Sequence, residues 1–222
     1  MTHLLAKQAR KAAASLFIFI TLTGSLPARP SGHEILTQAR AMIRAQDISI
    51  SGKIRTGPKN IVFQLSQQKG TSTYSFNDPV ETVIVTLGEA GVKLSGVNTS
   101  SARIRDSVLT YDDLTLRFLY WTTIEDQGTE KLRSLPCWKL RLDAPDKKAT
   151  YAFVKLWVNQ QSGAFIRAQA FDWNGTLAKQ FDVVSTQTIE GRYFLKSMKI
   201  QLFDKNLPNS ETLSYLEIDK PN

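Results

Sequence analysis

The stretch YAFVKLWVNQQSGAFIRAQAFDWNG, residues 151–175, decides the fold of this chain. Aliphatic or small residues alternate with polar or aromatic ones through 151–159 and again through 164–172. An alternation with a period of two is typical of β-strands that bury one face. QQSG separates the two runs, and Asn174-Gly175 after the second is a strong hairpin signal because both residues tolerate positive φ. The stretch therefore predicts antiparallel strands joined by tight turns.

The same period extends over most of the chain from residue 47 to residue 219. Runs such as DISISGKI (47–54), IVFQLSQ (61–67) and VETVIVTL (80–87) lie between turn-forming residues. We count about ten or eleven strands, and a sheet of that size tends to curl. The predicted fold is mainly β within the α+β class, namely an unclosed antiparallel β-barrel or curled sheet.

Two segments have helical periodicity instead. In residues 32–46, Ile35 and Ala39 belong to an apolar stripe that continues at Met42 and Ile43. In TYDDLTLRFLYW (110–121), Leu114, Phe118 and Trp121 have helical spacing. We predict helices over 34–46 and 111–121 and expect both to cover the concave face of the sheet.

The adjacent acids Asp112 and Asp113 raise the question of a catalytic pair. Thr110 followed by Asp113 resembles a capping box, which places both acids in the first turn of a helix. Neighbouring helical side chains diverge by about 100°, so the two carboxylates would not face one atom. We therefore interpret them as helix-capping residues.

The N-terminus has the order of a secretory signal. Lys7, Arg10 and Lys11 precede an uncharged apolar run over 12–26, and Ala28 offers a cleavage site. The run is shorter than the ~20 residues of a membrane span. We expect a signal peptide over 1–28 and a single exported domain over 29–222. The lone cysteine, Cys137, lies far from the signal, so no lipid anchor is expected.

Charge and motifs exclude several functions. The net charge is +8, but the basic residues are scattered, so no nucleic-acid partner is expected. We find no phosphate-binding loop and no nucleophile elbow, and two histidines are too few for a histidine metal site. No cofactor, metal or catalytic residue is predicted, although a glycosidase using carboxylates such as Glu81 or Asp172 stays open.

One face of the predicted strands is aliphatic with several small residues. It could be a core covered by helices, or a cavity that holds acyl chains, and the pattern does not separate the two. In the second case the candidate ligand-binding residues are Leu140, Leu142, Val154, Leu156, Ile166, Ala168, Met198 and Ile200, with Phe118 and Trp121 from the second helix.

Four tracts of the chain are distinctive: YDDLTLRFLYW, CWKLRLDAP, VKLWVNQQSGAFIRAQAFDWNGTLAKQFDV and IEGRYFLKSMKIQ. They resemble the outer-membrane lipoprotein-sorting proteins, the LolA-like family, and the resemblance spans roughly 34–218. It implies an unclosed β-barrel whose helices plug its mouth. It also implies a monomeric periplasmic carrier, not an enzyme, that takes acylated lipoprotein or lipid from an inner-membrane transporter to an outer-membrane acceptor.

The chain departs from the family at one point, and two alternative functions stay open. Well-known carriers have an Arg-Pro on an early strand, whereas this chain has Lys69-Gly70 there, so no lid residue is carried across. The same fold also serves lipid-carrying and envelope-stress-sensing proteins, so the alternative is a regulatory or adaptor module that senses lipids or binds a membrane partner. A carboxylate hydrolase is the third hypothesis.

Overall fold

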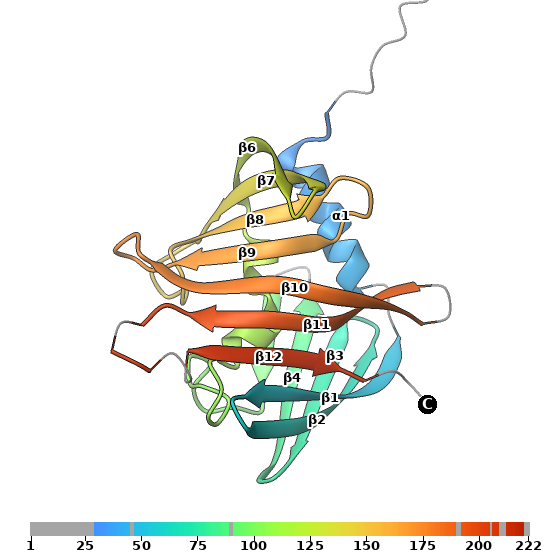
Figure 1. Cartoon of the computed structure of the whole chain (residues 1–222), viewed down its shortest axis with the longest axis vertical. Coiled ribbons are helices and arrows are strands. Elements are labelled where there is room, and N and C mark those ends of the chain that lie inside the picture. The colour runs from blue at the N-terminus through green and yellow to red at the C-terminus, as the bar shows by residue number, and fades with distance from the viewer. Residues whose placement is uncertain are drawn as a thin grey trace, which may run out of the picture.

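The computed structural model describes residues 29–44, 47–88, 91–189, 192–204, 206–208 and 212–219. Within them, twelve antiparallel strands form one sheet in the order β5-β4-β3-β2-β1-β12-β11-β10-β9-β8-β7-β6 (Figure 1). The strands are β1 (Ile48–Thr56), β2 (Lys59–Gln68), β3 (Thr71–Asn77), β4 (Val80–Gly88), β5 (Gly91–Ser95), β6 (Thr123–Leu132), β7 (Leu135–Asp143), β8 (Phe153–Asn159), β9 (Phe165–Phe171), β10 (Leu177–Ile189), β11 (Arg192–Leu202) and β12 (Leu213–Ile218).

Only one strand pair in the sheet is not sequential. β1 pairs with β12, with Gly52 opposite Ile218, and this joins the N-terminal hairpins to the C-terminal ones. The edge strands β5 and β6 do not pair with each other, so the sheet is unclosed, as predicted. In Figure 1, β3 and β4 run behind β12 and β1, and α1 (Gly32–Arg44) runs behind β8 and β9.

β6 was not predicted from the sequence, and the expected count of ten or eleven strands was therefore too low. Most of its residues are exposed, and acids such as Glu125, Asp126 and Glu130 face solvent. An edge strand that buries little of either face lacks the alternation that marks the other strands.

The aliphatic face predicted from the alternation forms the main core. Leu140 and Leu142 of β7, Val154 and Leu156 of β8, and Ile200 of β11 are all fully buried in one cluster. Ile35, Leu36 and Ala39 of α1 belong to the same cluster. The alternation therefore identified which side of these strands faces inward.

The predicted alternation was wrong in β9, where it placed Ile166 on the inner face. Phe165 lies in the main core instead, and Ile166 packs against a second cluster formed by Leu132, Cys137 and Trp157. The cause is a register shift between Trp157 and Val158, where β8 pairs with β9. A bulge inserts one extra residue and so reverses the side to which the following side chains point.

α1 begins with a capping box that the structure shows directly. The Ser31 backbone N–H donates to Glu34 Oε2 over 2.7 Å, and the Glu34 N–H donates to Ser31 Oγ over 3.3 Å. The Ser31 N–H, and then the Ser31 hydroxyl, which donates to the same Glu34 oxygen over 2.8 Å, lower the pKa of Glu34 below its usual value. The rest of the predicted apolar stripe, the side chains of Met42 and Ile43, lies outside the described residues, as do residues 45–46.

The helix predicted over 111–121 is instead two short 3-10 helices, η1 (Asp112–Thr115) and η2 (Arg117–Tyr120). They meet at Leu116, whose φ of 44° is left-handed. Thr115 Oγ1 donates to the Asp112 carbonyl over 2.6 Å and accepts from the Arg117 N–H over 3.1 Å. The hydroxyl thus replaces the backbone partners that would continue the helix.

None of the helices within the described ranges has the length and hydrophobicity needed to cross a bilayer. The predicted signal peptide, residues 1–28, lies outside the described residues. It stays a prediction, as does the single domain over 29–222.

Candidate functional site

An apolar cavity of about 230 Å³ lies between α1, the η1 segment and the central strands. Its lining from the sheet includes Ile48 and Ile50 of β1, Leu65 of β2, Leu195 and Met198 of β11, and Leu216 of β12. Three phenylalanines, Phe165, Phe181 and Phe194, add further apolar surface, and Ala39 contributes from α1. Strands β1, β2 and β9 to β12 therefore converge on one cavity together with the helical segments.

The cavity communicates with solvent. Several of its lining hydrophobics, including Leu65, Val183 and Leu216, are only half-buried, and Thr186 is exposed. Tyr74 of β3 lies at the wall, and desolvation raises its pKa to about 12 although solvent still reaches part of the side chain. An apolar molecule could therefore enter without the core being taken apart.

The structure divides the ten predicted ligand-binding residues. Met198 lines the cavity, and so does Ile166, although its side chain packs against the second cluster. The other eight belong to the main core and do not line the cavity: Leu140, Leu142, Val154, Leu156, Ala168, Ile200, Phe118 and Trp121. Seven of the eight predicted strand residues, all but Ile166, belong to the main core. The lining residues of β1, β2 and β12 were not predicted, although their alternation carried the same signal.

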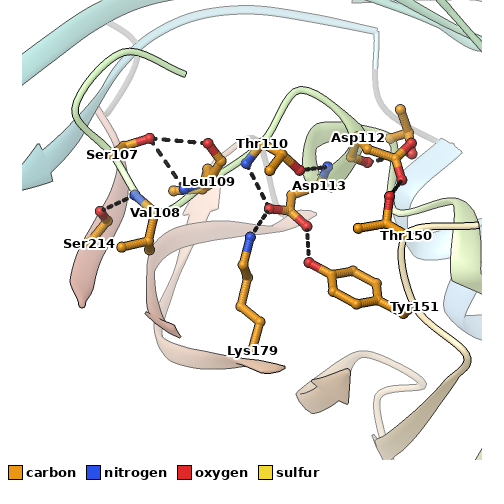
Figure 2. Close-up of polar contacts among 11 residues, drawn as sticks. Ser107, Val108, Leu109, Thr110, Asp112, Asp113, Thr150, Tyr151, Lys179 and Ser214 are labelled. Atoms are coloured by element: carbon orange, nitrogen blue, oxygen red, sulfur yellow. Dashed lines mark hydrogen bonds and ion pairs between the residues drawn. The ribbon is translucent and has the colours of Figure 1, made fainter. Parts of the chain in front are cut away.

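A buried polar cluster fixes η1 against the sheet beside the cavity (Figure 2). Asp113, which lines the cavity, accepts hydrogen bonds from the Thr110 N–H over 2.8 Å and from the Tyr151 hydroxyl over 2.7 Å. Its Oδ2 also accepts from the Lys179 ammonium of β10. Burial, and then the nearby Asp113 charge, raise the pKa of Tyr151 well above its usual value.

Thr110 and Asp113 exchange the bonds of the predicted capping box, because the Asp113 N–H also donates to Thr110 Oγ1 over 3.3 Å. The N-cap residue of η1 is Tyr111, however, and the Asp112 side chain takes no part in these bonds. The sequence did not reveal the other two hydrogen-bond partners of Asp113, which are Tyr151 and Lys179. Tyr151, which the alternation placed on the outer face, is buried in the core with its hydroxyl on Asp113. Lys179 is 3% exposed and so departs from the usual surface position of lysine.

The neighbouring Asp112 points to different partners. Its Oδ2 accepts from Thr150 Oγ1 over 2.8 Å, and its Oδ1 lies 2.7 Å from Arg117 Nε. The second contact is an ion pair by distance but lacks hydrogen-bond angles. Burial raises the pKa of Asp112, and the Thr150 hydrogen bond and the Arg117 charge oppose that effect. The two carboxylates therefore bind different partners and are not directed at one common atom. Their contacts hold η1 in place.

A second polar contact fastens the segment before η1. Ser214 Oγ of β12 accepts from the Val108 N–H over 3.1 Å (Figure 2). It also shares a 2.6 Å hydrogen bond with Thr56 Oγ1 of β1. Ser214 is fully buried. The segment is therefore tied to both halves of the sheet.

α1 is joined to η2 by one arginine. Arg40 Nε donates to the Leu119 carbonyl over 2.5 Å, and its guanidinium lies 5.2 Å from the centre of the Tyr120 ring. The early turn at Lys69-Gly70 links β2 to β3 and has positive φ at both residues. The contact described here between two helical segments is therefore made by Arg40 of α1 and not by a residue of that turn.

A family described as "Uncharacterized protein" matches residues 92–219, more than half of the chain. The chain belongs to this family. A comparison with curated proteins gives no match.

Solved structures share the fold of most of the chain. A LolA superfamily protein from Nitrosomonas europaea has a TM-score of 0.65 at 17% identity, covering 86% of this chain and 93% of its own. An outer membrane lipoprotein-sorting protein domain from Vibrio parahaemolyticus has a TM-score of 0.63 at 13% identity, and the match covers 85% of this chain and 90% of that protein. A DUF1329 family protein from Desulfovibrio piger has a TM-score of 0.60 at 14% identity, with the same coverage of 85% and 90%. The LolA-like fold expected from the sequence is therefore confirmed.

Proposed function

We propose that this protein is a periplasmic carrier that binds acyl chains of lipoproteins or lipids and delivers them toward the outer membrane. The observation that carries the proposal is the solvent-connected apolar cavity bounded by α1 and the η1 segment. Binding would be non-covalent. The LolA-like fold supports the same class of function, since one protein of similar fold is named for lipoprotein sorting.

The size of the cavity sets how much of an acyl chain it accepts. An apolar protein cavity of roughly 150 Å³ holds a benzene, so 230 Å³ corresponds to about nine carbon atoms. Burying that many methylenes contributes at most ~7 kcal/mol before the costs of association. A single short chain fits the cavity as it stands, whereas a long acyl chain requires more room.

The additional room would come from displacement of α1, which packs directly on the sheet. Gly32 of α1 sits so close to the sheet that an added Cβ would be 3.5 Å from Leu140 Cδ2 and 2.8 Å from Ile124 Cγ2. Ile35 and Leu36 pack in the same core as Leu142 and Val154. We propose that α1, η1 and η2 form the cover of the concave face and that movement of α1 exposes the predicted aliphatic residues to cargo.

The proposed location and partners follow from the same assignment. Export is supported by the signal-like N-terminal residues. An acyl-chain carrier in the periplasm requires a donor at the inner membrane and an acceptor at the outer membrane. We propose a transporter and an outer-membrane acceptor in these roles, with the carrier acting as a monomer.

The test compares two adjacent valines of β10. Val183 lines the cavity, whereas Val184 is 50% exposed and does not line it. The mature protein and its Val183→Gln and Val184→Gln variants would be purified from the periplasm under gentle conditions and weighed by native mass spectrometry. We expect an acylated ligand on the wild type and on Val184→Gln, and reduced occupancy on Val183→Gln.

Equal occupancy of the two folded variants would contradict the cavity assignment. A wild type that carries no ligand and also ignores added fatty acid and diacyl probes would contradict the carrier function. The lipid-sensing or adaptor hypothesis would then take its place.

A further inference from the structure

Two cations face each other on the side of the sheet that points away from α1, here called the outer face. Arg141 of β7 and Lys155 of β8 are directly opposite in the antiparallel register. Both alternate with fully buried residues of the core, so their side chains project outward. Directly opposed side chains in such a pair have Cβ atoms about 5 Å apart.

Aromatic rings hold both side chains in position. The Arg141 guanidinium lies 3.9 Å from the centre of the Phe153 ring, and the Lys155 ammonium lies 5.1 Å from that of Phe171. The two rings are themselves stacked, with centroids 4.4 Å apart and planes 12° from parallel. The cations therefore rest on a common aromatic base, which reduces the conformational entropy lost when they bind a ligand.

The charge of this pair is only partly compensated. Arg141 Nε donates to Asp143 Oδ1 over 2.9 Å. This bond leaves the two terminal guanidinium nitrogens of Arg141 to bind a ligand. Within the part of the chain that the structure describes, no carboxylate forms an ion pair with Lys155. Like charges directly opposite each other destabilise a sheet. An anion between them would relieve this repulsion.

The nearby cations are paired with carboxylates, as Arg141 is with Asp143. Lys139 is paired with Glu130 over 2.7 Å, and Arg167 is paired with Asp182 over 2.6 Å. Of these cations, Lys155 is thus the one for which the described residues provide no carboxylate partner. Arg141 lies beside it and is paired through Nε.

We propose that Arg141 and Lys155 form a binding site for a phosphate group on the outer face. Guanidinium groups match the geometry of phosphate oxygens, and an ammonium adds a point charge beside it. The phosphate comes either from the headgroup of an anionic lipid or from a small soluble phosphate. The site is separate from the cavity and does not rest on the carrier function.

The test uses inorganic phosphate and lipid vesicles as probes. Wild type, Arg141→Gln, Lys155→Gln and the control Lys199→Gln would be titrated with inorganic phosphate at constant ionic strength, with the melting temperature as readout. The same proteins would be sedimented with phosphatidylglycerol vesicles and with phosphatidylcholine vesicles. Lys199 is a matched control because it lies on an outward position of β11 between Tyr215 and Asp182, with no opposing cation.

We expect Lys155→Gln and Arg141→Gln to weaken phosphate or phosphatidylglycerol binding by at least about tenfold, with Lys199→Gln unchanged. A response to inorganic phosphate identifies a soluble ligand, and a response to phosphatidylglycerol alone identifies a lipid headgroup. No response to either probe, or an equal response of wild type and Lys155→Gln, overturns the site. Val183→Gln should keep the phosphate response, which separates this result from failure of the cavity.

Discussion

The Lys179 ammonium donates to Asp113 Oδ2 where both side chains are almost fully buried, at 4% and 1% relative exposure. The pair joins β10 to η1 at the wall of the cavity. Tyr151 and the Thr110 N–H complete the carboxylate's hydrogen bonds. A buried ion pair of this kind is a weak source of net stability, but the loss of one partner strands a charge.

Replacing Lys179 with methionine should therefore destabilise the protein by about 3–5 kcal/mol in the free energy of unfolding. Urea denaturation measures this value. The double variant Lys179→Met/Asp113→Asn should recover part of the loss, because neither charge is then buried alone. A loss below about 1 kcal/mol for Lys179→Met would show that the Asp113 charge is solvated in another way.

Asp112 should make the stability depend on pH in one direction. Burial raises the pKa of this carboxyl, so the folded chain holds its proton at pH values where the unfolded chain has lost it. In that window the folded state binds more protons, and the free energy of unfolding falls as pH rises. Relative to Asp112→Asn, the wild type should thus gain stability on acidification below neutral pH.

Urea denaturation of both proteins over an acidic pH series measures this difference. Asp106→Asn serves as control, because Asp106 forms an ion pair with Lys59 in which both side chains are exposed. If the wild type instead loses stability relative to Asp112→Asn on acidification, the ion pair with Arg117 outweighs desolvation.

Arg40→Met should loosen α1 without removing the aliphatic stem that packs beside it. The variant loses the hydrogen bond to the Leu119 carbonyl and the contact with the Tyr120 ring. We expect a loss of about 1–2 kcal/mol in the free energy of unfolding, faster amide exchange in α1 and faster release of a bound fluorescent fatty acid. Arg103→Met, at an exposed position, is the control. Unchanged release would show that the contact does not restrain the cover.

A cross-link should test directly whether α1 must move. A Cβ added at Gly163 would lie 3.4 Å from Gln38 Cβ of α1, close to the roughly 3.8 Å of a disulfide. Gln38→Cys/Gly163→Cys in a Cys137→Ala background should form this bond, although the φ of 71° at Gly163 makes a side chain there strained. The oxidised protein should bind a short fatty acid but not a diacyl probe. Reduction should restore diacyl binding, and equal binding in both states would mean that α1 stays in place.

Local chemistry accounts for the features that the sequence predicted correctly. The alternation in β7, β8 and β11 identified their inward residues, because the side-chain period of a strand is a property of the strand alone. Asn174-Gly175 forms the turn between β9 and β10, with Asp172 Oδ1 accepting from the Asn174 and Thr176 N–H groups. The bonds between Thr110 and Asp113 likewise span three residues.

The incorrect predictions concern places where a distant segment changes a local pattern. The bulge opposite Trp157 placed Phe165 inward and Ile166 outward, and nothing in the residues of β9 records it. The helix over 111–121 was divided at Leu116, where the Thr115 hydroxyl took the backbone hydrogen bonds. β6 was missed because its position at the sheet edge removes the need for an apolar face.

The sequence by itself determined the antiparallel strands, their turns and the aliphatic side of most of them, since these follow from side-chain period and turn chemistry. Only the tertiary structure decided which of those residues line a cavity. That depends on the pairing of β1 with β12, which brings Leu65 and Leu216 to the same wall as Met198. The tertiary structure likewise brought Lys179 to Asp113, because η1 packs against β10, and it set Arg141 opposite Lys155 through the register of β7 and β8. Neither contact is encoded in any one segment.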